Sequence, residues 1–221
     1  GAAAVAADTK FSPLVSPIDE TSASQIVESD AVIIDAAVKH AHGAYMKHLD
    51  ATVAKRLEWL NAAADAIDKI EAELVRSLIR DIGKPRRAAT FEAKRAGAFI
   101  RACAAQLPHI NGEVLPLDTA PTGAGRFGFT TRIPYGVVAA ITPFNGPVNL
   151  LVQKIAPAMA VGNAVVVKPS PPGTEVALLI AEAVKKAGVP DGLFNVVPGG
   201  RQTAQLLVAH PLVAAITATG S

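Results

Sequence analysis

The sequence predicts an α/β protein in which helices come first and a helix-covered parallel sheet follows. Apolar residues make up 50% of the chain and aromatic residues only 5%, so small aliphatic side chains must fill the core. Such side chains suit helices packed on a parallel sheet. From Pro134 onward, short β-branched runs alternate with helical segments, as in strands joined by crossover helices. Before Pro134, apolar residues recur at the three- and four-residue spacing of helices.

The bulk composition argues against two classes of partner. The 221 residues carry a net charge of +2, from 21 basic and 19 acidic residues, so nothing electrostatic suggests a nucleic-acid or membrane partner. No apolar run approaches the roughly 18 residues of a membrane span. Cys103 is the only cysteine, so no intrachain disulfide can form. We therefore expect a reducing compartment, the cytoplasm.

Two helices should follow an N-terminal segment, residues 11–29, in which we expect one or two strands. Asp30 is a residue type that caps helices, so the first helix should run from there to about His48. Its predicted inward-facing residues are Val32, Ile33, Ala36, Ala37 and Ala41. Asp50 repeats the capping signal before the second helix. The residues predicted to face inward there are Val53, Leu57, Leu60, Ala64 and Ile67.

Two more helices and an arm should precede the sheet. A third helix, over residues 71–82, should end at Gly83, since glycine readily takes the left-handed conformation that stops helices. Pro85 fits the first turn of a fourth helix that continues to about Leu107. Turn residues dominate after that. The residues that then alternate at strand spacing are Phe127, Phe129, Thr131 and Ile133.

Gly123, Gly125 and Gly128 have the spacing of a dinucleotide-binding glycine loop, but their surroundings do not fit one. That loop needs a buried strand before it and a helix after it. Here Pro121 and Thr122 precede the glycines, and a β-branched strand follows them. We interpret the glycines as the loop of a hairpin.

The second half of the chain should form a right-handed parallel sheet. Strands are predicted over residues 137–141, 164–168, 194–197 and 214–217, and helices over 147–160, 173–187 and 202–209. Asn145 and Lys168 each follow a strand, so an amide and an ammonium should meet at the edge where open α/β sheets bind ligands. An amide held rigidly between Pro143 and Pro147 can donate to a developing oxyanion. From the residues alone, a turn asparagine and a solvated lysine remain the plainer interpretations.

A resemblance to a known family changes that balance. The segments that carry it are Ile82-Gly83-Lys84-Pro85, Glu92, Pro143-Phe144-Asn145, Lys168-Pro169-Ser170, Val197-Pro198-Gly199 and Thr219-Gly220-Ser221. Together they resemble the aldehyde dehydrogenase superfamily over nearly the whole chain. The resemblance implies that the sheet is the Rossmann-like sheet of the family's coenzyme domain. It also implies that Asn145 is an oxyanion donor and that Lys168 contacts the adenosine ribose.

The resemblance further implies which residues contact the coenzyme. They are Ile141, Thr142, Pro143, Phe144, Lys168, Ser170, Pro171, Gly199, Gly220 and Ser221. Family members that prefer NAD usually carry a glutamate where this chain has Pro171. Proline neither binds ribose hydroxyls nor repels a 2′-phosphate, so NAD and NADP both remain open.

Three regions are expected by the same resemblance. Residues 1–112 would form an N-terminal arm and the helical part of the coenzyme domain. Residues 113–133 would form a β-strand arm that pairs subunits, so that the complete protein is a homo-oligomer, a dimer or a tetramer. Residues 134–221 would form the Rossmann-like coenzyme-binding part, which is incomplete.

The activity implied by the resemblance is the NAD(P)-dependent oxidation of a small-molecule aldehyde to a carboxylic acid through a cysteine thiohemiacetal. The chain lacks the family's nucleophile and base motifs, so we expect a truncated portion that is inactive alone. A truncated nucleotide-binding or interaction module and a CoA-acylating relative are the alternatives. Cys103, in an alanine-rich helix, is interpreted as a structural thiol. His40, His42 and His48 are not expected to bind a metal.

Overall fold

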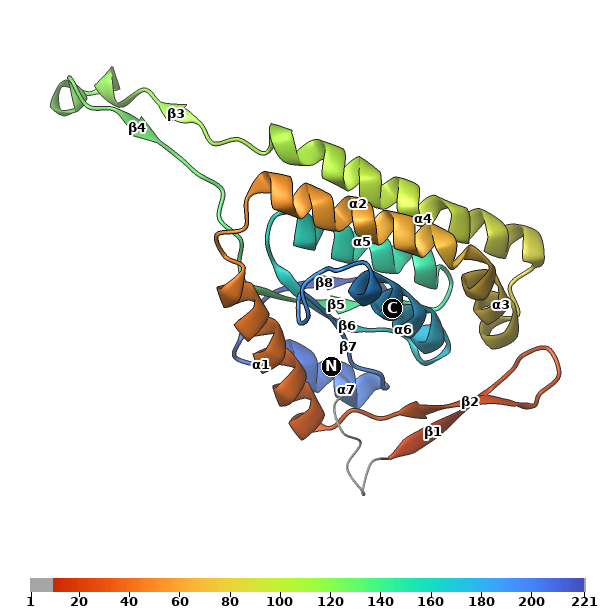
Figure 1. Ribbon diagram of the computed structural model, residues 1–221. Coiled ribbons are helices and arrows are strands. Elements are labelled where there is room, and N and C mark those ends of the chain that lie inside the picture. Colours follow the sequence, from red (N-terminus) through yellow and green to blue (C-terminus); the bar gives the residue numbers. More distant parts are fainter. Residues whose placement is uncertain (1–9, 221) are drawn as a thin grey trace.

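The computed structural model describes residues 10–220, and its centre is a four-stranded parallel sheet (Figure 1). The strands are β5 (Val137–Ile141), β6 (Ala164–Lys168), β7 (Phe194–Val196) and β8 (Val213–Ala218). Their order is β7-β6-β5-β8, with every neighbouring pair parallel. This confirms the predicted sheet, and the strand ends differ from the predicted ones by a residue at most.

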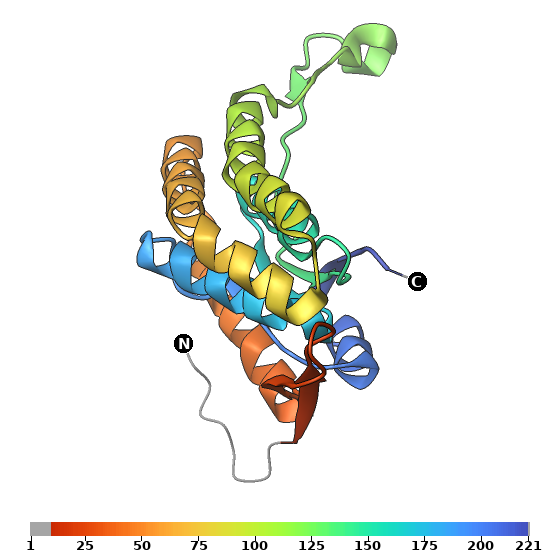
Figure 2. The same ribbon diagram turned by 90° about the vertical axis from the view of Figure 1, so that its right-hand side faces the viewer.

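Helices cover both faces of the sheet (Figures 1 and 2). One face is covered by α1 (Ala31–Lys47) and α7 (Arg201–Val208). The other carries α5 (Pro147–Ala160) and α6 (Thr174–Lys186), and α2 (Val53–Lys69), α3 (Glu71–Ile82) and α4 (Arg86–Gln106) form a further layer outside them. Small aliphatic residues of β5 and β6 are almost fully buried between these layers, as their composition requires.

The first helix begins where the sequence predicts, but it buries a different face. The Asp30 carboxylate accepts hydrogen bonds from the backbone N–H groups of Val32 (3.0 Å) and Ile33 (2.9 Å), which confirms the cap. Val32, however, is 76% exposed. The residues of α1 that are buried are Ile34, Val38, Ala41 and Ala44. The predicted inward-facing stripe was therefore wrong except at Ala41, because the apolar residues of this helix extend around it and the sheet covers only one side.

The predicted start of the second helix needs a similar correction. The residue that caps α2 is Thr52, whose hydroxyl accepts from the backbone N–H of Lys55 at 3.2 Å, and not Asp50. The inward face of α2 was better predicted, because Leu60, Ala64 and Ile67 are buried. Val53 is 40% exposed, since it belongs to the first turn of the helix.

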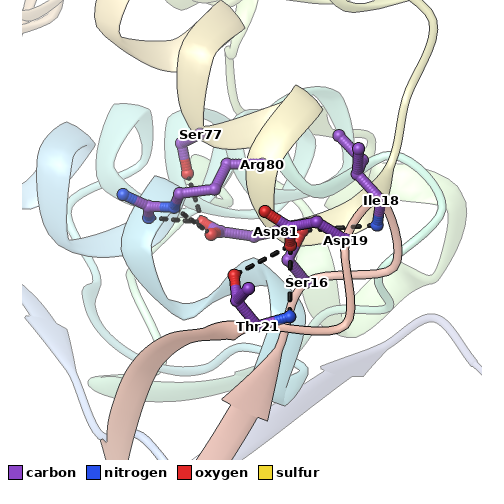
Figure 3. A network of polar contacts seen from close by, with 7 residues as sticks. All are labelled: Ser16, Ile18, Asp19, Thr21, Ser77, Arg80 and Asp81. Carbon is purple, nitrogen blue, oxygen red and sulfur yellow. Dashed lines mark hydrogen bonds and ion pairs between the residues drawn. The ribbon is translucent and has the colours of Figure 1, made fainter.

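The turn of an N-terminal hairpin lies close to the end of α3. Its strands are β1 (Phe11–Val15) and β2 (Ser22–Val27), which pair antiparallel. Gly83 ends α3 in the left-handed conformation, with a φ of 70°, and a Cβ atom there would lie 3.1 Å from Pro17 in the hairpin turn. Figure 3 shows this region, where the buried Asp81 carboxylate accepts from Ser77 Oγ at 2.8 Å and pairs with Arg80. The turn of the hairpin therefore lies close to the end of α3, and the other end of the hairpin reaches Gly200 after β7 through Glu28.

A second hairpin projects away from the body of the molecule (Figure 1). Its strands, β3 (Val114–Leu115) and β4 (Gly128–Phe129), pair antiparallel over two residues each. The strand is therefore shorter than the alternation over residues 127–133 predicts. Two short 3₁₀ turns, Leu117–Thr119 and Pro121–Gly123, connect the strands. The glycines thus lie in a hairpin and not between a buried strand and a helix, which confirms that they are no dinucleotide-binding loop.

Within residues 10–220, no helix combines the length and the apolar character needed to cross a bilayer.

Candidate functional site

The carboxyl ends of β5 and β6 are tied together beyond the last strand residues. The backbone N–H of Thr142 donates to the carbonyl of Lys168 (3.2 Å), and that of Ser170 donates to the carbonyl of Thr142 (2.9 Å). The loops that follow the two strands therefore leave the sheet side by side. We call this region, formed by the residues after β5, β6, β7 and β8, the carboxyl edge.

Asn145 lies in the loop between β5 and α5. Pro147 occupies the first turn of α5, where its fixed backbone angle is tolerated. Phe144, which is 57% exposed, and Asn145 both face solvent. The carbonyl of Asn145 accepts a hydrogen bond of 2.8 Å from the Lys84 ammonium. Lys84 thus holds the backbone of Asn145, while the exposed side-chain amide of Asn145 stays accessible at the carboxyl edge.

A buried ion pair lies behind this loop. Glu92 of α4 is 4% exposed, and its Oε1 accepts from the backbone N–H groups of Val148 (2.8 Å) and Asn149 (3.2 Å) in the first turn of α5. Its other carboxylate oxygen pairs with Lys84. Sequence reasoning noted Lys84 and Glu92 only as part of a family resemblance. The signal that was available is a carboxylate inside the buried alanine stripe of a helix.

Lys168 is buried at the end of β6, with 7% of its surface exposed. Its ammonium donates to the carbonyl of Gly199 at 3.3 Å. Burial lowers the pKa of Lys168 below its ordinary value, because the charged form is deprived of water, and the nearby carboxylate of Glu28 partly opposes this. The solvated strand-end interpretation of Lys168 is therefore excluded by its burial.

Glu28, which sequence reasoning missed, reaches the same place from the end of the N-terminal hairpin. One carboxylate oxygen accepts from the backbone N–H of Gly200 at 2.8 Å, and the other accepts from Ser12 Oγ at 3.0 Å. Gly199 and Gly200 share a peptide unit, so Lys168 and Glu28 bind opposite ends of one peptide group. No local pattern in the sequence indicates this contact.

The turn after β7 depends on glycine. Gly199 has a φ of 142°, and a Cβ atom there would lie 2.1 Å from Thr203 Oγ1. Two hydrogen bonds connect the turn to the hairpin: the N–H of Ser29 donates to the carbonyl of Pro198 (3.1 Å), and Thr203 Oγ1 donates to the carbonyl of Ser29 (2.9 Å). The turn after β7 is thus held against the backbone of Ser29, which follows the N-terminal hairpin.

Those of the remaining predicted coenzyme residues that the structure describes lie at or near this edge. Ser170 Oγ is buried and has no hydrogen-bond partner among the residues that the structure describes. Pro171 opens a short 3₁₀ turn and offers no carboxylate. Gly220 is exposed with a φ of 157°, and Ser221 lies outside the described residues. A buried ammonium, an unsatisfied hydroxyl and a glycine turn at one edge fit a ligand rich in hydroxyl groups, such as a ribose.

Lys154 is a second buried lysine that sequence reasoning missed. It is 8% exposed, and its ammonium donates to Thr219 Oγ1 at 2.7 Å and lies 3.4 Å from Thr217 Oγ1. Burial lowers its pKa. The backbone N–H of Thr219 in turn donates to the carbonyl of Ile141 at 3.1 Å. Lys154 therefore connects α5 to the carboxyl end of β8, next to the Asn145 loop.

The other candidates lie elsewhere. Cys103 is a half-buried thiol on α4, and burial raises its pKa, which makes it a poor nucleophile. His40 lies 3.4 Å from the Asp191 carboxylate, and the His48 ring packs edge-on against Trp59. Within residues 10–220, no cluster of three or more histidine, cysteine or acidic side chains is arranged to hold a metal ion.

The aldehyde dehydrogenase family model matches residues 4–221 of this chain. The chain belongs to the aldehyde dehydrogenase family. This confirms the resemblance that the motifs carried. The chain is similar to 2-aminomuconic 6-semialdehyde dehydrogenase of Pseudomonas sp, at 39% identity over 93% of this chain and 43% of that protein.

Solved aldehyde dehydrogenase structures confirm the fold. The NADP-dependent glyceraldehyde-3-phosphate dehydrogenase of Bacillus halodurans C-125, complexed with NADP, superimposes with a TM-score of 0.89 at 31% identity, over 94% of this chain and 44% of that one. The NAD-dependent benzaldehyde dehydrogenase of Corynebacterium glutamicum superimposes with a TM-score of 0.88 at 30% identity, over 96% and 46%. This chain thus spans less than half the length of these family members.

Proposed function

We propose that this chain forms the coenzyme-binding portion of an NAD(P)-dependent aldehyde dehydrogenase that oxidises a small-molecule aldehyde to a carboxylic acid. The observation that carries the proposal is the buried Lys168 ammonium, which donates to the carbonyl of Gly199 at the carboxyl edge, where the Ser170 hydroxyl is also unsatisfied. In this proposal Lys168 and Ser170 bind the ribose hydroxyls of the coenzyme. The coenzyme, when bound, supplies the hydride acceptor.

Asn145 has the second role in the proposal. Its amide donates a hydrogen bond to the oxygen of the aldehyde as negative charge develops there, which lowers the barrier because the donor is already in place. Cys103 does not supply the attacking thiolate, since burial raises its pKa. The proposal therefore assigns the nucleophile and the general base to residues outside these 221, in an enzyme that works in the cytoplasm.

The choice between NAD and NADP stays open in the proposal. The relatives named above include one structure with NADP and one enzyme that depends on NAD. Pro171 neither binds ribose hydroxyls nor repels a 2′-phosphate. A carboxylate that acts on Lys168 is that of Glu28, which accepts from the N–H end of the Gly199–Gly200 peptide while Lys168 donates to its carbonyl.

We further propose that the complete protein is a homo-oligomer, assembled through the 113–133 arm. In a single chain, apolar side chains of the arm are exposed to water: Val114 is 69% exposed, Phe127 76% and Phe129 63%.

The test of the proposed function is coenzyme binding to the full-length protein. NAD and NADP are each titrated by calorimetry against wild type, Lys168→Met and the exposed control Lys186→Met. A hydrogen bond from a charged group contributes about 1.5–3 kcal/mol, so Lys168→Met should raise the Kd of the bound coenzyme roughly 10- to 100-fold. Failure of wild type to bind either coenzyme, or equal affinity in Lys168→Met, would overturn the proposal.

A further inference from the structure

Lys84 and Glu92 form a buried pair that no step of the proposed reaction uses. Their side chains are 15% and 5% exposed. Burying two charges is costly unless they are paired and further hydrogen-bonded. Here the further hydrogen bonds of both groups go to one segment, from Asn145 to Asn149.

The two residues hold that segment at both ends. The Lys84 ammonium donates to the carbonyl of Asn145 at 2.8 Å. Two residues past Gly146, the backbone N–H of Val148 donates to Glu92 at 2.8 Å. The positive N-terminal end of α5 suits the carboxylate, and the partly negative carbonyl suits the ammonium. The Asn145–Gly146 and Pro147–Val148 peptide groups are therefore fixed by charges from another part of the chain.

We propose that Lys84 and Glu92 are positioning residues for Asn145. Asn145 is exposed, and no hydrogen bond to its side chain is present among the described residues, so its backbone sets where the amide lies. An oxyanion donor is effective only if it is already placed when charge develops. The pair supplies that placement by fixing the Asn145 carbonyl and the first turn of α5. The inference rests on the proposed role of Asn145 as the oxyanion donor.

A simpler role, in which the pair only stabilises the fold, makes a different prediction. A pair that only stabilises the fold would lower the apparent kcat by reducing the fraction of folded enzyme, would leave KM and the coenzyme Kd unchanged, and would do so whether or not Asn145 is present. A positioning pair acts through Asn145, so its effect disappears when the amide is absent. A double-mutant cycle on kcat separates the two roles.

The cycle compares wild type, Glu92→Gln, Asn145→Ala and the double variant in the full-length enzyme, with aldehyde and saturating coenzyme. Asn145→Ala should lower kcat roughly 10²- to 10³-fold, as expected for one lost oxyanion donor. Glu92→Gln should lower kcat about 10-fold or more, with coenzyme Kd unchanged, because a displaced donor loses part of its effect. The double variant should be no slower than Asn145→Ala alone. If the two losses multiply in the double variant, the positioning role is wrong.

Two further variants secure the result. Lys84→Met removes the contact to the Asn145 carbonyl but keeps the Glu92 cap on α5, so it should give the same non-multiplying pattern even if Glu92→Gln fails to fold. As a control, Asp65→Asn breaks the exposed ion pair between Asp65 of α2 and Arg101 of α4, and it should leave kcat unchanged. If Asn145→Ala retains wild-type kcat, the proposed role of Asn145 fails. If Asn145→Ala is slow and the losses multiply, only the positioning inference fails.

Discussion

Lys168 shows how a single buried charge is adjusted by its neighbours. Burial lowers its pKa, and the carboxylate of Glu28 acts in the opposite direction. Because the folded-state pKa lies below the unfolded one, the cost of burying the ammonium is fully present below the folded pKa and is relieved as pH rises toward the unfolded value. In the role proposed for Lys168, coenzyme binding favours the opposite state, because the protonated ammonium is the form that donates a charged hydrogen bond to a ribose hydroxyl.

Removal of the Glu28 charge should therefore shift the pH dependence of coenzyme binding. In wild type, coenzyme affinity should fall as pH rises through the pKa of Lys168, which lies below the usual lysine range. In Glu28→Gln, the pKa of Lys168 falls further, so the loss of affinity should begin at lower pH. The measurement is the coenzyme Kd across a pH series. Glu20→Gln, at the exposed hairpin turn, is the control, and an identical midpoint in Glu28→Gln and wild type would contradict the coupling.

Pro171 gives a second prediction at the scale of the residue. A carboxylate introduced next to Lys168 would bind ribose hydroxyls and repel a 2′-phosphate. We expect Pro171→Glu in the full-length enzyme to shift the ratio of kcat/KM toward NAD by about 10-fold or more, equivalent to about 1.4 kcal/mol. Pro172→Glu, one position along the same 3₁₀ turn, is the control. A ratio that Pro171→Glu leaves unchanged would show that Pro171 does not face the ribose.

Among the elements, α1 shows that the start of a helix and its buried face can have different causes. The beginning is local, because the Asp30 carboxylate binds N–H groups two and three residues away. The buried face is not local, because α1 carries apolar residues on more than one side and the sheet selects Ile34 and Val38. Val32 remains outside despite its size and is 76% exposed.

The cap of α1 makes a direct prediction about stability. Asp30→Ala leaves the N–H groups of Val32 and Ile33 without this acceptor and should lower the free energy of unfolding by about 1 kcal/mol. Asp50→Ala is the matched control, because Asp50 precedes α2 without capping it, and it should change stability by less than about 0.5 kcal/mol. Denaturant unfolding at neutral pH provides both values. Equal losses in the two variants would contradict the assignment of the caps.

At the scale of the whole molecule, two features favour association. The 113–133 arm projects away from the body (Figure 1). On this arm, the ring centroids of Phe127 and Phe129 lie 6.0 Å apart. Strand β8 is the last strand on one side of the described sheet, and Ile216 on it is 55% exposed. Unpaired strand edges and exposed apolar patches both promote contact between chains. We therefore expect the 221-residue chain to self-associate.

The arm can be tested separately from the strand edge. The double variant Phe127→Asp and Phe129→Asp should lower the average mass in sedimentation velocity, because charged side chains would have to be buried in an arm-mediated contact. Phe91→Asp on α4 replaces a similarly exposed ring, 63% exposed, on the body of the molecule and should leave the mass unchanged. An unchanged mass in the arm variant would assign the association to another surface.

Much of the architecture was predictable from the sequence because the signals for it are local. Strand β6 contains three consecutive valines, and α3 stops at the glycine that takes a left-handed conformation. Asn145 and Lys168 were placed at one edge for a topological reason, since parallel strands carry their carboxyl ends to the same side. These features depend on residues a few positions apart and on a general rule of chain connection.

The residues that support that edge come from distant parts of the chain. Glu28 binds the N–H of Gly200 across 172 positions, and Glu92 binds that of Val148 across 56. Such contacts leave no periodic pattern in the sequence, because the two partners come together only when the layers of the fold have packed. Burial likewise arises from packing, and it lowers the pKa values of Lys154 and Lys168, two lysines that in isolation would look solvated. Local sequence patterns specify the sheet and its carboxyl edge, and the packing of distant segments determines how the groups on that edge are charged and held.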